Sequence, residues 1–168
     1  LWSFTLAPYQ KGRITGFLFP ERDPLGTSYN VIQSKIAVGS AGFFGKGFGG
    51  GTQARLGFLP AAHNDFLFAA FVEEWGVAGA LAVLAAYLVF LARILSIGAR
   101  VNDNYSRFVT IGAATLFLAQ FFINTGSNVG LLPVTGLTFP FFSYGGSSLL
   151  TAALLVGIIQ HIHVESSS

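Results

Sequence analysis

Acidic side chains gather where the chain enters its first long apolar stretch, and Asp65 is well placed there for acid–base chemistry. It ends the run Leu59-Pro60-Ala61-Ala62-His63-Asn64-Asp65, directly before that stretch. A carboxylate at the edge of an apolar environment is partly desolvated, which raises its proton affinity and suits a general base. The alternative is an N-cap or first-turn acid that the helix dipole favours.

Glu73 and Glu74 lie deeper in the same stretch. An ionisable residue inside an apolar span indicates a functional site, and such a residue is normally paired with another charged or polar group. On a helix Glu73 lies about 80° around from Asp65 and Glu74 about opposite, so only Glu73 could share a cavity with Asp65. The alternative is a pair of structural ion pairs with Lys46, Arg55 or helices outside this chain.

A second polar segment, residues 138–148, carries backbone N–H groups and hydroxyls to a point where a helix begins. Such a place suits an anionic headgroup, and the alternative is a capped, kinked helix entry. The residues expected to contribute are Ser143, Tyr144, Gly145, Gly146, Ser147 and Ser148.

The histidines do not predict a metal site. His161 and His163 are two residues apart and therefore point about 200° apart on a helix. His63 fits an orienting or interfacial role better than that of a ligand.

The glycine-rich run 39–51 could approach a ligand or a membrane interface closely, because glycine tolerates conformations that other residues avoid. It satisfies the G-x-G-x-x-G pattern from Gly45 to Gly50, but no strand precedes it, so a dinucleotide site is not expected. Before the run, Thr27 or Ser28 could cap a helix lying along the membrane surface. Its apolar side would comprise Val31, Ile32, Ile36 and Ala37.

The composition indicates a membrane protein. Of the 168 residues 52% are hydrophobic and only 10% are charged, with a mean hydropathy of +0.63, against roughly 25% charged residues in a soluble domain. A net charge of +2 gives no basic field for nucleic acid. The absence of cysteine excludes disulfides, thiolate metal sites and Cys nucleophiles. The sequence contains no methionine, and we interpret it as part of a longer protein.

Two uncharged stretches, 75–92 and 108–160, predict the membrane spans. About 20 helical residues cross a bilayer, so the first stretch fits one span and the second fits two. We expect an all-α polytopic membrane protein, a helical bundle forming a single membrane domain over residues 1–168, and not a large soluble helical core. The expected spans are 68–95, 108–123 and 141–161, with an outer loop at 124–140 that is rich in glycine and proline.

Basic residues in the short loop between the first two spans set the expected orientation. Arg93, Arg100 and Arg107 face a single Asp103 there, which places the loop in the cytoplasm. The C-terminus is then cytoplasmic, and residues 9–67 form a large extracytoplasmic loop with short interfacial helices. An ordered loop of this length indicates a working part of the protein.

Taken together in this order, the motifs resemble the SEDS family (shape, elongation, division and sporulation), polytopic membrane proteins that polymerise peptidoglycan. The match covers roughly residues 9–160 and is closer to the elongation members than to the division members. The matching stretches are Arg13-Ile14, Phe17-Leu18-Phe19-Pro20, Asp23-Pro24-Leu25-Gly26, Gln33-Ser34-Lys35-Ile36-Ala37, Gly45-Lys46-Gly47, Gly51-Thr52-Gln53, His63-Asn64-Asp65-Phe66, Glu73-Glu74, Gly130-Leu131-Leu132-Pro133 and Phe142-Ser143-Tyr144-Gly145-Gly146-Ser147-Ser148.

The resemblance implies the C-terminal part of a ten-helix fold, in which residues 1–8 end a transmembrane helix. It also assigns the catalytic carboxylate to Asp65, whereas spacing alone favours the N-cap or first-turn acid. Two departures stand out: Asn64 replaces the usual Thr, and Ala61 and Ala62 leave no glutamate after Leu-Pro. The first is a mild polar exchange, and neither alters Asp65.

The implied activity is that of a glycosyltransferase that polymerises lipid II in the bacterial cytoplasmic membrane. Asp65 would act as base on the acceptor 4-hydroxyl, with polyprenyl pyrophosphate as the leaving group. A cationic residue, or a divalent cation such as Mg²⁺ or Mn²⁺, could neutralise that group. The expected substrate-binding residues, besides the 143–148 segment, are Lys46, Gln53, Arg55, His63 and Glu73.

Two other functions remain open. A flippase for the lipid-linked precursor would suit the intramembrane glutamates and the glycine- and proline-broken segment. A scaffold would act through a partner, and the resemblance implies a class B penicillin-binding protein as that partner.

Overall fold

The computed structural model describes residues 8–19, 28–55, 65–143 and 145–166, and within these ranges the regular elements are helices. The elements are α1 (Pro8–Leu18), α2 (Tyr29–Ser40), α3 (Thr52–Arg55), α4 (Leu67–Arg100), α5 (Asn104–Asn128) and α6 (Gly146–Glu165). In this part of the chain α4, α5 and α6 are long and apolar enough to cross a membrane. The predicted all-α membrane fold is confirmed.

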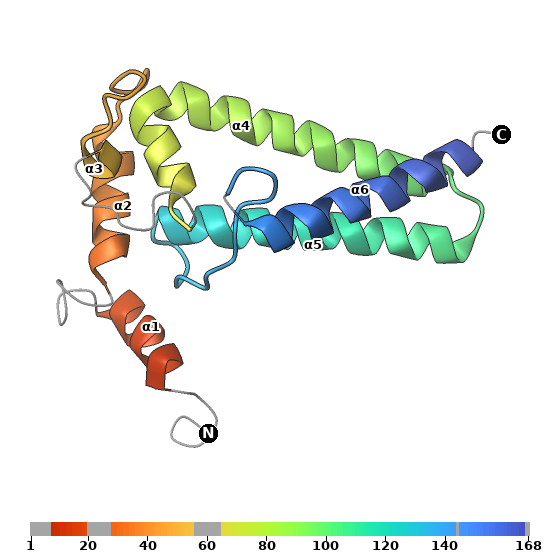
Figure 1. The fold of residues 1–168 in the computed structure, drawn as a ribbon, viewed down its shortest axis with the longest axis horizontal. Helices are drawn as coiled ribbons and strands as arrows, with labels where there is room; N and C mark the ends of the chain where they lie inside the picture. Colours follow the sequence, from red (N-terminus) through yellow and green to blue (C-terminus); the bar gives the residue numbers. More distant parts are fainter. Residues whose placement is uncertain (1–7, 20–27, 56–64, 144, 167–168) are drawn as a thin grey trace.

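The long arms of α4 and α5 lie side by side and antiparallel (Figure 1). Aromatic side chains fill the space between them: Tyr87 stacks on Phe121 at 4.3 Å, and Phe90 meets Phe117 edge to face at 5.3 Å. Buried tyrosine needs a hydrogen-bond partner, and the Tyr87 hydroxyl donates to the Phe117 carbonyl at 3.0 Å. This aromatic layer fixes the α4–α5 pair.

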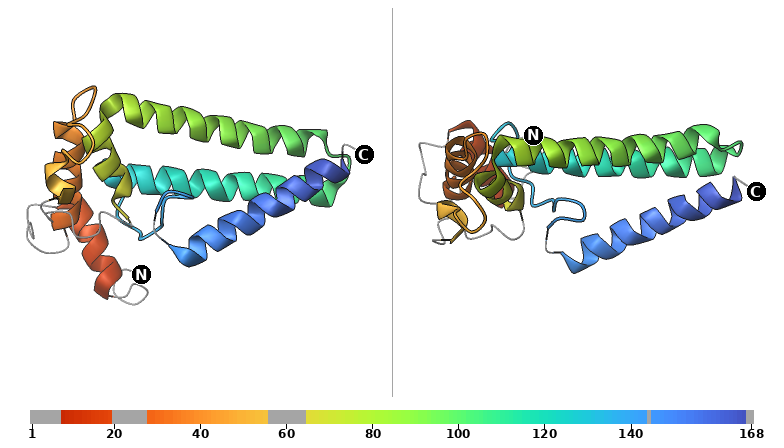
Figure 2. Two further views of the ribbon diagram at one scale, coloured as in Figure 1. Left: turned by 45° about the horizontal axis from the view of Figure 1, so that its top comes forward. Right: turned by 90° about the horizontal axis from the view of Figure 1, so that it is seen from above.

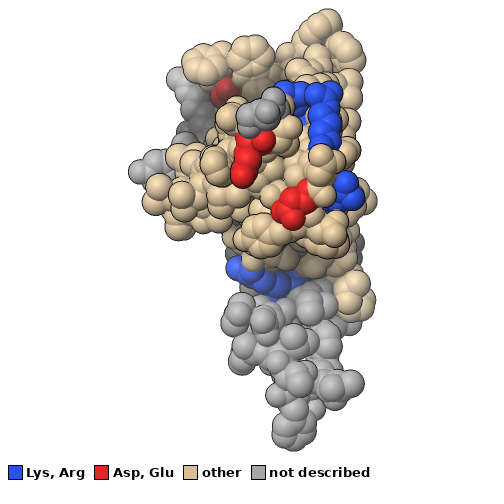
Figure 3. Space-filling view, turned by 90° about the vertical axis from the view of Figure 1, so that its right-hand side faces the viewer, with Lys and Arg blue, Asp and Glu red and all other residues tan. Residues whose placement is uncertain are grey.

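A short polar turn, residues 101–103, joins α4 to α5. Asp103 caps α5 by accepting a hydrogen bond from the Ser106 backbone N–H at 2.9 Å, and that bond lowers the pKa of the carboxyl. Arg93, Arg100 and Arg107 are exposed here. Figure 3 looks onto this end of the molecule and shows basic and acidic side chains on its surface.

Helix α6 meets the α4–α5 pair at its C-terminal end and diverges from it toward its N-terminal end (Figure 2). Its buried residues are Ala152, Ile159 and Ile162. At the C-terminal end a guanidinium nitrogen of Arg93 lies 3.2 Å from Nε2 of His163. The close approach of α6 to α4 is therefore at the polar end of the bundle.

Helix α4 is broken at Gly76, whose φ of 71° and ψ of −168° are not helical. The first part, residues 67–75, turns across the end of the bundle opposite the 101–103 turn (Figure 1). A break leaves carbonyl groups before it and N–H groups after it without helical partners. In an apolar environment these groups must be satisfied within the protein.

Residues 41–51, which we call the glycine loop, satisfy those groups. The N–H groups of Lys46 and Gly47 donate to the carbonyls of Glu73 and Glu74, both at 3.0 Å. In return Val77 donates to the Gly42 carbonyl at 3.1 Å and Ala78 to the Phe43 carbonyl at 3.0 Å. The sequence analysis expected a transmembrane helix over 68–95 and did not predict a break at Gly76, which these long-range partners stabilise.

Two predicted boundaries around the 124–140 segment are wrong. Residues 124–128 continue α5 as a helix, because Asn124 and Asn128 lie one turn apart and turn their amides toward the start of α4. At the other boundary, residues 141–145 do not start the third span. Phe141 has a φ of 62°, and the Phe139 carbonyl accepts from Phe142 and Ser143 in a turn, so α6 begins only at Gly146.

The predicted surface helix exists as α2 but differs in detail. Ser28 is its N-cap without a side-chain cap, and its hydroxyl instead donates to the Gly16 carbonyl at 3.1 Å. Ile36 is exposed, while Ser34 and Ala37 are buried. Thr27 lies outside the described residues, as do residues 1–7 of the predicted helix end at 1–8, and Pro8 begins α1.

Replacing Gly76 by Ala should destabilise the protein. A Cβ at this position would clash with the backbones of Gly45 and Phe43, and the positive φ disfavours an L-residue. We expect a loss of about 2 kcal/mol or more in the free energy of unfolding, measured by thermal denaturation in detergent. The matched control is Gly112→Ala, because a Cβ there meets nothing within 4 Å. Equal stability of the two variants would contradict the docking of the glycine loop.

Candidate active site

Asp65 lies in the turn that leads into α4, and two asparagines of α5 hold its backbone. The Asp65 carbonyl accepts hydrogen bonds from Asn124 Nδ2 at 3.2 Å and from Asn128 Nδ2 at 2.9 Å. Both asparagines are buried. Buried amides with several partners restrict motion because each lost hydrogen bond would leave a polar group unsatisfied. The backbone at Asp65 is therefore fixed against α5.

Asn128 also caps α4 from outside the helix. The N-cap residue of α4 is Phe66, which has no polar side chain, and Asn128 Oδ1 instead accepts from the Ala69 N–H at 3.1 Å. Asp65 stands one residue before the N-cap, and the first turn of α4 holds no acidic residue. The predicted alternative of Asp65 as an N-cap or first-turn acid is wrong, and its carboxylate is left for another role.

The Asp65 carboxylate and the Arg13 guanidinium approach the same point, Gly136 in the segment between α5 and α6. An ideal Cβ on Gly136 would lie 4.0 Å from Asp65 Oδ2 and 3.7 Å from an Arg13 terminal nitrogen. Asn124 fastens this segment to the Asp65 turn, since its Nδ2 also donates to the Leu137 carbonyl at 2.7 Å. Three segments distant in sequence thus meet at Gly136, and an acid and a cation both come within about 4 Å of the Cβ position there.

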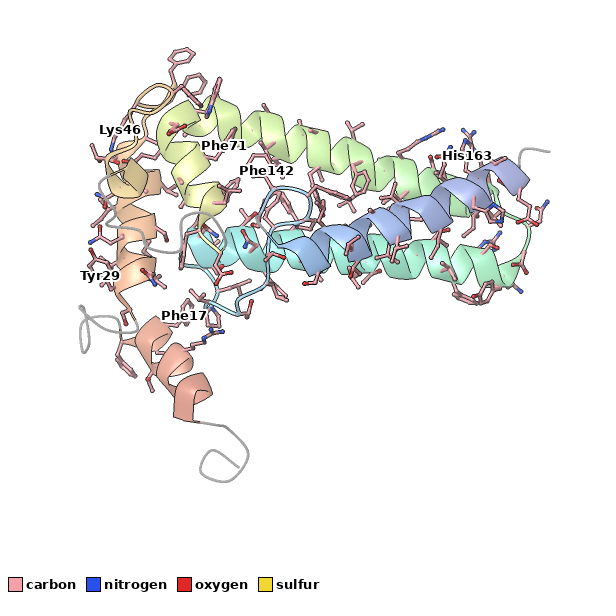
Figure 4. All side chains as sticks on the ribbon, viewed as in Figure 1. Phe17, Tyr29, Lys46, Phe71, Phe142 and His163 are labelled. Atoms are coloured by element: carbon pink, nitrogen blue, oxygen red, sulfur yellow. The ribbon has the colours of Figure 1, made fainter. Side chains whose placement is uncertain are left out.

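A second polar cluster lies at the break of α4 and is built around Glu73. Its side chain is fully buried, and Oε1 accepts from Lys46 Nζ at 2.6 Å, from the Thr52 N–H at 2.9 Å and from the Thr52 hydroxyl at 3.0 Å. The Gln53 N–H donates to Oε2 at 3.1 Å. Figure 4 places Lys46 at the glycine loop, beside the bend of α4.

The Glu73 cluster joins three elements, since Lys46 belongs to the glycine loop and Thr52 and Gln53 begin α3. A buried carboxylate needs compensating donors, and Glu73 has them all from this chain. The ion pair with Lys46, one of the two interpretations offered by the sequence, is present. Glu74 differs: its Oε1 accepts from the Gly49 N–H at 3.2 Å in an exposed setting.

The segment before α6 has hydrogen bonds of its own. Ser143 Oγ accepts from the Phe139 N–H at 2.9 Å, and Ser148 Oγ donates to the Gly145 carbonyl at 2.9 Å. Phe142 meets Phe71 of α4 edge to face, with ring centroids 5.4 Å apart (both residues are labelled in Figure 4). The segment therefore packs on the first part of α4, the part that follows Asp65.

The start of α6 also borders a cavity of about 180 Å³ between α5 and α6. Its polar lining comes from Gln120, Ser147, Ser148 and Thr151. Gly146 is exposed at the first turn of the helix. Hydroxyls and a helix N-terminus thus face the same region.

Some predicted residues cannot be placed. His63 and Tyr144 lie outside the described residues, and so does the side chain of Arg55. Within the described ranges, no three His, Asp or Glu side chains form a group that could hold a metal ion.

Arg13, Asn124 and Asn128 are site residues that the sequence analysis did not select. The two asparagines carried a usable signal, because they are four residues apart in an uncharged stretch and so share one helix face. Arg13 stood within a matching motif, but nothing in its spacing relates it to Asp65.

Comparison with known proteins agrees with the motif resemblance. The family model for the FtsW, RodA and SpoVE group, described as cell cycle protein, matches residues 1–168. The peptidoglycan glycosyltransferase MrdB of Escherichia coli K12 is 44% identical over 165 residues, covering 98% of this chain and 45% of MrdB. A probable peptidoglycan glycosyltransferase FtsW of Thioalkalivibrio sp. is 42% identical over 163 residues, covering 95% of this chain and 40% of the relative.

A solved structure has the same fold. It belongs to a study of structural coordination of polymerization and crosslinking by a peptidoglycan synthase complex. The TM-score is 0.73 at 37% identity, covering 96% of this chain and 43% of that one. The chain thus spans less than half the length of these relatives.

Glu73→Gln should destabilise the protein, because it leaves the Lys46 ammonium without its carboxylate inside the cluster. Breaking a buried ion pair from one side costs about 3 kcal/mol, to be measured as a lower thermal denaturation midpoint. The neighbouring Glu74→Gln should change stability by less than about 0.5 kcal/mol, since its carboxylate is not buried. Similar effects of the two substitutions would show that the Glu73 cluster does not hold the fold.

Proposed function

Because the chain belongs to the FtsW/RodA/SpoVE family of cell cycle proteins, the SEDS family that its motifs resemble, we propose that it carries the catalytic carboxylate of a peptidoglycan glycosyltransferase. The observation that carries this proposal is the Asp65 carboxylate, which approaches Gly136 together with the Arg13 guanidinium on a backbone held by Asn124 and Asn128. Relatives named peptidoglycan glycosyltransferase at 42–44% identity support it.

The reaction we propose joins two molecules of lipid II. Asp65 takes the proton of the acceptor 4-hydroxyl as the hydroxyl oxygen attacks the anomeric carbon of the donor sugar. The bond from that carbon to the pyrophosphate oxygen breaks, and polyprenyl pyrophosphate leaves with the bonding electrons. The fixed backbone at Asp65 favours this role, because a base must be held within hydrogen-bond reach of the proton it takes.

The leaving pyrophosphate needs positive charge or N–H donors nearby. We assign the first of these roles to Arg13, whose guanidinium suits bidentate contact with phosphate oxygens. The start of α6, with Ser147, Ser148 and its N-terminal N–H groups, is a second candidate. Arg55, His63 and Tyr144 remain candidates on the resemblance alone.

For Lys46, Gln53 and Glu73 we propose a positioning role in place of the substrate binding expected from the sequence. Glu73 is fully buried, and donors from this chain occupy both its oxygens. The Lys46 ammonium donates to Ser40, Thr52 and Glu73. These bonds hold α3 against the break of α4, and they leave the Glu73 carboxylate and the Lys46 ammonium little capacity for a ligand. Gln53 joins the cluster through its backbone N–H, and its side-chain Oε1 is buried without a hydrogen-bond partner in the described part of the chain.

The proposed location is the bacterial cytoplasmic membrane, with Asp65 on the extracytoplasmic side and the C-terminus in the cytoplasm. Three exposed arginines at the α4–α5 turn support this orientation through the positive-inside tendency. The start of α4, which follows Asp65 in the chain, lies at the end of the bundle opposite that turn (Figure 1). The long prenyl chain of lipid II would then lie in the same membrane as the spans.

We also propose a role in cell elongation beside a class B penicillin-binding protein that cross-links the new glycan. Support for a partner comes from the solved relative, which belongs to a peptidoglycan synthase complex described as coordinating polymerization and crosslinking. Support for elongation comes from the motif resemblance and from the MrdB and RodA relatives, although FtsW relatives are about equally similar.

A flippase is the competing function, and the broken helix α4 is the feature that would suit it. The carbonyls and N–H groups at the break, however, are paired with the glycine loop, and Glu73 is paired with Lys46. Transport sites need such groups to be available to a substrate. The geometry therefore favours the enzyme.

Asp65→Asn should abolish polymerisation of lipid II by the purified protein in detergent or vesicles. The amide keeps the shape of the side chain but cannot accept the proton, and loss of a general base lowers rates by about 10²–10⁴-fold. The measurement is the amount of glycan polymer resolved on a gel, with stability checked by thermal denaturation.

Asp103→Asn is the matched control, because this exposed aspartate lies at the other end of the bundle and only caps α5. We expect it to polymerise at the normal rate. Normal polymerisation by Asp65→Asn would show that the base is another residue. A wild-type protein that only moves lipid between leaflets would exclude the glycosyltransferase.

A further inference from the structure

The glycine loop carries three phenylalanines that the described part of the chain leaves largely exposed. Phe43, Phe44 and Phe48 are 59%, 82% and 90% exposed. Phe43 meets Phe44 edge to face at 4.9 Å. The loop stands at the edge of the molecule beside the bend of α4 (Figure 1). Large apolar side chains gathered on one exposed loop usually indicate an interaction surface.

The loop is otherwise suited to an apolar environment. Lys46 is its only charged residue, and the ammonium is turned inward to Glu73 at 2.6 Å. The other residues of the loop are glycines, the three phenylalanines and Ala41. A Cβ on Gly47 or Gly49 would meet nothing within 4 Å, so these positions face open space. The loop's own residues therefore present aromatic rings on its outer part, and one charge of α4 borders them: the Glu74 carboxylate accepts from the Gly49 N–H at 3.2 Å.

The depth of the loop follows from its attachment to α4. Its backbone bonds to α4 at residues 73–78, on both sides of the break. Along the axis of α4, Arg93 lies about 24 Å from Val77 and Arg100 about 35 Å from it. These two distances bracket the thickness of a bilayer's hydrocarbon core, which is roughly 30 Å. With the arginines at one interface, the loop lies at the level of the other.

The surface next to the loop is also apolar. Trp75 and Val77 flank the break and are 51% and 44% exposed, and Leu81, one turn further along α4, is 53% exposed. Exposed apolar residues on a membrane helix suit contact with lipid. Aromatic residues are enriched where such a helix leaves the hydrocarbon core.

We propose that Phe43, Phe44 and Phe48 insert into the membrane interface opposite the α4–α5 turn and anchor the glycine loop to the lipid. The occupant of this surface is thus the headgroup–acyl boundary of the bilayer. Because Lys46 and the start of α3 are bonded to Glu73, the anchor also fixes the level of the Glu73 cluster. This inference does not depend on which reaction the protein catalyses.

Nitroxide labels on single cysteines test the proposal, since this chain has no cysteine of its own. Labels at Phe44→Cys and Phe48→Cys are compared with one at Asn102→Cys, an exposed polar position in the α4–α5 turn. The protein is reconstituted alone into phosphatidylcholine–phosphatidylglycerol vesicles. For each label, the rate of collision with oxygen, which concentrates in lipid, is compared with the rate of collision with a water-soluble nickel chelate.

Labels at positions 44 and 48 should collide with oxygen severalfold more often than with the nickel chelate, and the label at 102 should do the opposite. Ratios at 44 and 48 equal to that at 102 would overturn the proposal by placing the loop in water. Low accessibility to both reagents would also overturn it, because another part of the protein would then cover the rings.

Discussion

The rest of the structure depends on how the backbone of α4 is satisfied at Gly76. A break in a membrane helix leaves polar groups that lipid cannot pair. Here the glycine loop supplies two N–H groups to the carbonyls of Glu73 and Glu74 and two carbonyls to Val77 and Ala78. Glycine is required at both Gly45 and Gly76, because a Cβ on either would collide with the backbone of the other segment. The same contact brings Lys46 to Glu73.

A second set of hydrogen bonds fixes the other end of the short helix 67–75. Asn124 and Asn128 hold the Asp65 carbonyl, and Asn128 supplies the cap that Phe66 cannot. The segment that carries Asp65 is thus held at its start by α5 and at its end by the glycine loop. Rigid support of this kind is what a general base needs, because a small misplacement of the reacting group costs much of the rate.

The sequence predicted those features that depend on local composition. Uncharged stretches predicted the three long helices because hydropathy is a property of each segment, and Asp65 was selected through the family motifs. The break at Gly76 and the helical state of 124–128 could not be predicted in this way. Both rest on partners far along the chain: Gly42 and Phe43 for the break, Asp65 and Leu137 for the asparagines. The approach of Arg13 and Asp65 to Gly136 likewise joins segments about fifty residues or more apart.

Hydrogen–deuterium exchange of single backbone amides tests the interlock of the glycine loop with α4 most directly. In the protein in lipid nanodiscs, the amides of Lys46 and Gly47 should exchange as slowly as those of Val77 and Ala78, because all four donate across the break. The amide of Asn102, in the exposed α4–α5 turn, donates no backbone hydrogen bond within the described residues and should exchange fast. Fast exchange at Lys46 and Gly47, at the rate of Asn102, would contradict the interlock and with it the positioning of the Glu73 cluster.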